Sequence, residues 1–120
     1  MLYLFSSVNL SNDGNILAVG ALSEDSCATG INGDQTDNGC NDSGAVYIFK
    51  RTGTIWSQQT YIKASNTDVG DGFGIVSLSN DGNTLAIAAS SEDSCATSIN
   101  GDQTNNGCSV AGAVYVYESN

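Results

Sequence analysis

The chain has 120 residues, no histidine or proline, and a formal net charge of −10 from 13 acidic and 3 basic residues. Nucleic-acid binding depends on Lys and Arg meeting phosphates, so this balance argues against nucleic acid and against anionic membrane surfaces as partners. No apolar run approaches the ~20 residues of a spanning helix, so we expect no membrane insertion. Met1–Phe5 is too short for a signal peptide and lacks its basic start, so we expect any leader to lie outside this sequence.

Two copies of one unit, offset by 68 residues, make up the chain. Val8–Asn15 returns as Val76–Asn83, and 30 of 45 positions are identical when residues 8–52 are aligned with residues 76–120. Self-similarity at a fixed period is typical of repeat architectures, in which each unit is one supersecondary element. We therefore predict a first repeat at residues 1–68 and a second at residues 69–120, which lacks the last part of the unit.

The first half of each unit predicts a hairpin. Apolar residues alternate over residues 73–79, as in a half-buried strand. The Asn-Asp-Gly-Asn turn at residues 80–83 follows, and the same turn occurs at residues 12–15. Asp-Gly between strands is a strong hairpin signal because glycine accepts positive φ. Thr84–Ala89 is apolar on both faces, which favours an inner strand.

The second half of each unit contains a long polar loop and then a strand. Gly112–Tyr117 and the matching residues 44–49 are aromatic and β-branched, which favours strand. A turn at residues 51–54 leads to the alternating, more polar segment Ile55–Lys63, as expected of an outer strand. The chain thus predicts an all-β fold of antiparallel four-stranded β-propeller blades, about 1.75 blades per chain, the second without its fourth strand.

These residues resemble the FG-GAP repeat family, the integrin-α-like β-propeller repeats, in the form found in bacterial secreted or surface proteins. Phe73-Gly74 stands at the family's Phe-Gly, and Val19–Ala21 stands at its Gly-Ala-Pro, with Leu22 in place of the proline. Leu78–Ala86 is similar to the bacterial version. The resemblance covers nearly the whole chain and implies a rigid propeller that presents loops for adhesion.

The chain departs from the family pattern in two respects. The first repeat has Phe5-Ser6 in place of Phe-Gly. Many family members carry a calcium loop, Asp-x-Asp-x-Asp-Gly, where this chain has Ser-Asn-Asp-Gly-Asn at residues 11–15 and 79–83. One carboxylate in a tight hairpin cannot supply the six to eight oxygens that calcium takes. The family's metal site therefore does not carry over to these hairpins.

One pair of cysteines lies in each long loop. Cys27 and Cys40 are 13 residues apart, as are Cys95 and Cys108. Four cysteines allow three pairings, and the repeat symmetry favours the two local bridges. Bridges imply an oxidising compartment, so we expect an extracellular or cell-surface protein. A zinc site is the alternative, but zinc usually takes cysteines two to four apart, often with histidine.

The same loops are rich in oxygen-bearing side chains and glycine, a composition that hard cations such as calcium require. The candidate ligands are Asp25, Asn32, Asp34 and Asp37 in the first repeat and Asp93, Asn100 and Asp102 in the second. Asn105 replaces Asp37, so we expect the second site to be weaker. Turn chemistry is the alternative, because Asn, Asp and Gly cap turns through side-chain to backbone hydrogen bonds.

The composition favours a non-catalytic protein. Without histidine there is no Ser-His-Asp or Cys-His arrangement, and bridged cysteines leave no thiolate. Glu24 and Asp25 resemble the paired carboxylates of a glycosidase, but adjacent loop carboxylates are usually just solvated. Trp56 and the tyrosines of the third strand are interpreted as packing residues rather than sugar platforms.

We therefore expect an extracellular repeat module for adhesion or for protein or glycan binding through its loops. The alternative is a structural repeat protein that assembles with copies of itself, or with further repeats of the same kind. Fewer than two blades leave strand edges and apolar faces uncovered, which favours association. Four chains would supply about seven blades for a closed ring, and an open filament forms if the rotation does not close.

Overall fold

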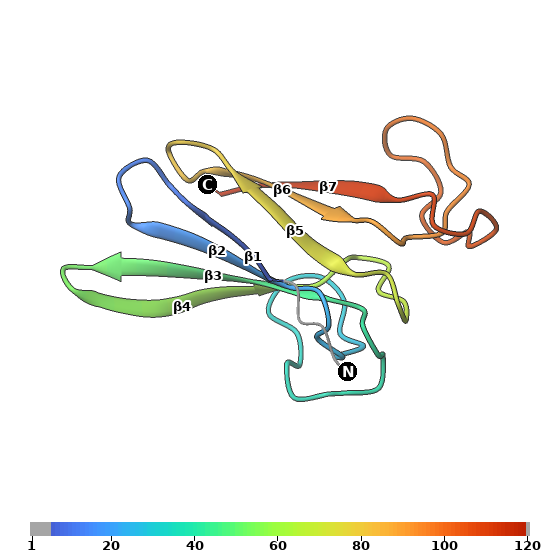
Figure 1. Cartoon of the computed structure of the whole chain (residues 1–120), viewed down its shortest axis with the longest axis horizontal. Coiled ribbons are helices and arrows are strands. Elements are labelled where there is room, and N and C mark those ends of the chain that lie inside the picture. The colour runs from blue at the N-terminus through green and yellow to red at the C-terminus, as the bar shows by residue number, and fades with distance from the viewer. Residues whose placement is uncertain (1–5, 120) are drawn as a thin grey trace.

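The computed structural model describes residues 6–119, which form two antiparallel sheets joined by a link (Figure 1). The four-stranded sheet has the order β1 (Ser6–Leu10), β2 (Ile16–Ala21), β3 (Ala45–Thr52) and β4 (Ile55–Ile62). The three-stranded sheet has the order β5 (Phe73–Leu78), β6 (Thr84–Ala89) and β7 (Ala113–Glu118). The all-β class and the pattern of four strands followed by three are confirmed. The apolar start Met1–Phe5 lies outside the described residues.

The tight hairpins are stabilised by a serine and an aspartate within the turn. The Ser11 hydroxyl donates to Asp13 Oδ1 over 2.8 Å and accepts from Ile16 N over 3.0 Å, while Asn15 N donates to the same carboxylate oxygen. Gly14 has φ 73°, the left-handed conformation that the Asp-Gly signal predicts. The hydrogen bond from Ser11 and that from Asn15 lower the pKa of Asp13. This carboxylate therefore acts as a turn residue.

The core lies between the two sheets, where one face of the second sheet packs on one face of the first. β5 contacts β1, β2 and β3. Two β1 side chains accept hydrogen bonds from β5, since Ser7 Oγ binds Val76 N and Asn9 Oδ1 binds Leu78 N. These contacts fix the second sheet on the first. The buried apolar cluster consists of Ala18, Val46, Ile62, Ala64, Phe73, Leu85, Ile87 and Ala89.

One close backbone contact explains a difference between the repeats. A Cβ atom at Gly20 would lie 1.6 Å from the Gly74 carbonyl oxygen, so β2 accepts only glycine where β5 crosses it. Ala88 occupies the corresponding position of β6, on the face opposite to the buried Leu85, Ile87 and Ala89, and no sheet covers that face within residues 6–119. Glycine at this position therefore marks the sheet that carries a neighbour.

Candidate functional site

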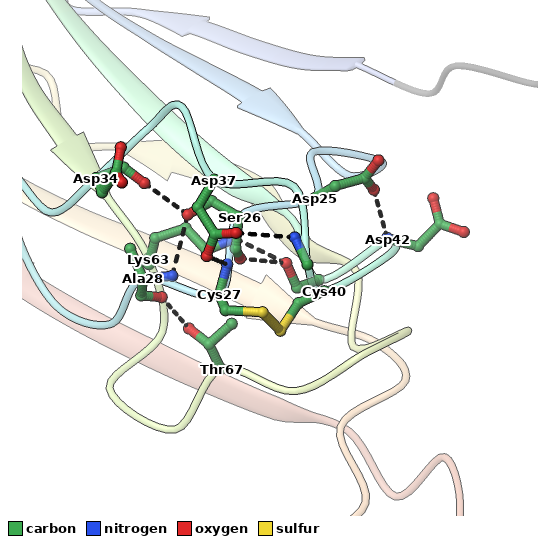
Figure 2. Close-up of a disulfide and its surroundings, with 12 residues drawn as sticks. Asp25, Ser26, Cys27, Ala28, Asp34, Asp37, Cys40, Asp42, Lys63 and Thr67 are labelled. Carbon is green, nitrogen blue, oxygen red and sulfur yellow. Dashed lines mark hydrogen bonds between the residues drawn. A yellow bond between two sulfur atoms is a disulfide. The ribbon is translucent and has the colours of Figure 1, made fainter.

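The two long loops each contain one disulfide. Cys27 bonds to Cys40 with a Cα–Cα distance of 5.0 Å (Figure 2). Cys95 bonds to Cys108 with a Cα–Cα distance of 4.9 Å. The first loop joins β2 to β3 and the second joins β6 to β7. The predicted local pairing is confirmed, and it engages all four cysteines, which leaves no thiolate for zinc.

In the first loop the predicted carboxylate ligands accept hydrogen bonds from nearby backbone. Asp25 Oδ1 accepts from Asp42 N over 2.8 Å, and Asp37 accepts from Cys27 N over 3.1 Å and from Gly39 N over 3.0 Å (Figure 2). Asp34 accepts from both the amide and the hydroxyl of Thr36, and these hydrogen bonds lower the pKa of Asp34.

The second loop repeats this pattern. Asp93 accepts from Val110 N over 2.7 Å, and Asp102 accepts from the amide and hydroxyl of Thr104. Asn105 accepts from Gly107 N, so the change from Asp37 to asparagine keeps the turn contact. The hydrogen bonds are those of turn chemistry, and within residues 6–119 no three acidic, Cys or His side chains gather at metal-binding range. Calcium binding stays a prediction.

A buried ion pair anchors the first loop to β4. Lys63 Nζ lies 2.9 Å from Glu24 Oε1 and donates to Ser43 Oγ over 2.7 Å. Tyr61 donates its hydroxyl proton to the other oxygen of Glu24 over 2.7 Å. The Lys63 side chain has 0% exposure and that of Glu24 has 13%. Burial lowers the pKa of Lys63, and Glu24 opposes this effect. The pair was not predicted from the sequence, although the glutamate recurs at the same place in both repeats, as Glu24 and Glu92.

Backbone pairing adds to this anchor. Lys63 N donates to Gly30 O, while Asn32 exchanges hydrogen bonds with Tyr61 through its backbone amide and its Oδ1 atom. Ile31 forms a bridge with Ile62. The end of β4 is therefore held between β3 and loop residues 30–32. Asn32, one of the predicted metal ligands, positions this strand in the structure.

The second loop has a different base. Glu92 corresponds to Glu24 and is only 2% exposed, but its neighbour is the neutral Asn66, whose Nδ2 atom lies 3.3 Å from Glu92 Oε1. Asn66 Oδ1 in turn accepts from the Tyr115 hydroxyl. Asp71 is buried nearby, and burial together with the charges of Asp68, Glu92 and Asp93 raises its pKa to about 6. This acidic site faces no cation within residues 6–119.

Asp71 is expected to make stability increase as the pH falls from 7 toward 4. Its carboxyl binds a proton more tightly in the folded chain, with a pKa of about 6, than at the ordinary value of 3.8, so folding takes up a proton in this range. A shift of about two pKa units corresponds to roughly 3 kcal/mol, which solvent screening reduces to an expected effect of about 1 kcal/mol.

The measurement is urea unfolding of the wild type and of Asp71→Asn between pH 4.5 and 7. We expect the variant to be more stable at pH 7 and to lack the upward trend on acidification. Asp42→Asn, at an exposed loop position, is the matched control and should keep the trend. Equal slopes for the wild type and Asp71→Asn would exclude Asp71 as the source. Exposed carboxylates with lowered pKa values, such as Asp13, lose their contribution only below this range.

Fold and loops together define an acidic, disulfide-stabilised repeat of antiparallel sheets. The two disulfides indicate an oxidising, extracellular-type environment. Residues 6–119 contain no helix of the length and apolarity that crossing a membrane requires. Comparison with protein-family models, with curated proteins and with solved structures finds no match.

Proposed function

We propose that the chain is a non-catalytic extracellular repeat module, built from blades of an FG-GAP-like β-propeller, that binds a protein or glycan through its disulfide-tied loops. The observation that carries the proposal is the rigid attachment of a polar loop. A disulfide closes the first loop, and the buried pair of Lys63 and Glu24 fixes its base to β4. A rigid scaffold that presents exposed loops is a common design for binding proteins.

The position of the loops supports this role. Each lies at the end of its sheet opposite to the tight hairpin that joins the first two strands (Figure 1). The exposed side chains of Gln35, Thr36 and Asn38 recur in the second loop as Gln103, Thr104 and Asn106. Amides and hydroxyls of this kind suit hydrogen bonding to sugars or to a protein surface.

The test is binding of the oxidised chain to a glycan array and to immobilised extracellular proteins. We expect specific retention that falls about tenfold in the double variant Gln35→Ala and Asn38→Ala, as loss of buried hydrogen bonds at an interface predicts. Gln59→Ala, on the exposed face of β4, is the matched control. Retention that is absent across the array, or equal in all variants, would contradict the proposal.

Self-assembly is the second candidate, and the faces of the two sheets favour it. Val8 and Leu10 are 64% and 53% exposed on β1, although their counterparts Val76 and Leu78 pack against the core. Conversely, Val114 is 67% exposed on β7, although its counterpart Val46 is buried. The two uncovered surfaces are therefore copies of the two surfaces that pack together inside the chain, an arrangement typical of head-to-tail assembly.

Light scattering decides between these functions. Particles well above the chain mass of 12.3 kDa would favour assembly, and Val114→Glu should dissociate them because it places a charge in the contact. Val69→Glu, at an equally exposed position in the link, is the control. A monodisperse monomer would exclude assembly and leave the loop-binding role.

A further inference from the structure

A groove runs along the free edge of β7, at the base of the second loop. It has a volume of about 740 Å³ and is lined by β7 together with Glu92, Ser94, Ser98 and Asn100. β7 is the last strand of its sheet, so one side of its backbone pairs with β6 and the other borders the groove. An unpaired strand edge is a template for another strand.

The first repeat shows what fills the corresponding space. There β4 pairs along β3, with Tyr61 opposite Tyr47 and Ile62 opposite Val46. Its end inserts between β3 and the loop, and Lys63 reaches Glu24 at 2.9 Å. The second repeat has the strand that corresponds to β3 and the loop, but no strand that corresponds to β4 within the described residues.

The second loop already has the backbone conformation that receives such a strand. Ser98 and Asn100 have φ 67° and φ 58°, close to the 74° of Gly30 and the 59° of Asn32. A left-handed conformation is unfavourable for serine, which has a Cβ atom. In the first loop these two positions hydrogen-bond the end of β4, whereas in the second they have no such partner within residues 6–119.

The groove contains a buried carboxylate that faces no cation within residues 6–119. Glu92 is 2% exposed, and its hydrogen bonds within the described residues, from Asn66 and from Ser94 N, all reach Oε1. In the first repeat the corresponding glutamate contacts both the tyrosine of β4 and the lysine that directly follows this strand. A buried carboxylate without a compensating charge is costly. Ala111 replaces Ser43, so the ammonium group would have one acceptor fewer here than in the first repeat.

We propose that this groove is a docking site for an extended strand of β4 chemistry, which pairs with β7 and carries a lysine for Glu92 and a tyrosine two residues before it. The site deepens the proposed role as a repeat module and rests on it. It uses the β7 edge and part of the second loop, whereas Gln35 and Asn38 of the first loop do not line it. Failure of strand docking would therefore leave loop binding to be judged by its own assay.

The test uses a fluorescein-labelled peptide with the sequence of residues 55–64, added to the whole oxidised chain. We expect saturable binding by fluorescence anisotropy, together with increased protection of β7 amide protons from hydrogen exchange. Changing the peptide lysine that corresponds to Lys63 to glutamine should weaken binding at least about tenfold, because Glu92 then lacks its cation. Glu92→Gln in the chain should cause a similar loss, and combining both changes should add little further loss.

Glu118→Gln is the matched control, because Glu118 lies on β7, is exposed and does not line the groove. If Glu92→Gln does not fold, the two peptides on the unchanged chain still decide the question. Equal affinity of the lysine and glutamine peptides would overturn the proposal, as would equal affinity of a scrambled peptide, which would indicate a non-specific apolar occupant. No binding up to about 1 mM, an affinity near 4 kcal/mol, would also overturn it.

Discussion

Lys63→Met is expected to lower the free energy of unfolding by about 3–5 kcal/mol, the loss measured when one partner of a buried ion pair is removed. The variant leaves the Glu24 carboxylate, 13% exposed, without the ammonium that lies 2.9 Å away. It also removes the donor to Ser43 Oγ and loosens the end of β4 on the first loop. Native domains are stable by only about 5–15 kcal/mol, so the change should be large in urea unfolding at pH 7.

A second variant separates the ion pair from simple packing. Glu24→Gln combined with Lys63→Met removes both charges and keeps an acceptor for the Tyr61 hydroxyl, so it should regain most of the stability. Lys50→Met, at an exposed lysine of β3, should change stability by less than about 0.5 kcal/mol. If the double variant is no more stable than Lys63→Met, the loss comes from packing rather than from an uncompensated charge.

Local signals in the sequence were sufficient to predict the strands. The two Asp-Gly turns, centred on Gly14 and Gly82, define hairpins, and glycine is required there because φ is 73° and 77°. The disulfide pairing followed from repeat symmetry, which assigns Cys27 and Cys40 to one loop. Strand bounds differed by one to three residues. Gly112 was predicted as strand, whereas β7 begins at Ala113, and Arg51 and Thr52 were predicted as turn, whereas β3 extends to Thr52.

The site depended on long-range contacts that local patterns do not contain. Lys63 joins Glu24 across 39 residues, and a lysine at the end of a polar strand is usually exposed. Gly20 and Ala88 look like a neutral difference between repeats until β5 is seen to cross β2. The loop carboxylates were compatible with either calcium or turn chemistry, because the sequence does not tell which way a side chain such as Asp37 points.

Removing the two disulfides one at a time is expected to give unequal losses of stability. Each closes a loop with a sequence separation of 13, for which chain entropy gives a cost of about 3 kcal/mol for either bridge. The first loop also pairs with the end of β4 through Gly30 and Asn32, whereas the second has no such strand within residues 6–119. Losing the bridge between Cys27 and Cys40 should therefore loosen β4 as well as the loop.

We expect Cys27→Ser with Cys40→Ser to cost about 3–4 kcal/mol and the corresponding pair at Cys95 and Cys108 to cost about 2–3 kcal/mol in urea unfolding. Hydrogen exchange should show the cause, as β4 amides lose protection only in the first variant. Equal losses with unchanged β4 protection would mean that the bridges act on the unfolded chain alone. In that case the disulfide would not be needed to hold β4 in place. The ion pair of Lys63 and Glu24 would be sufficient to do so.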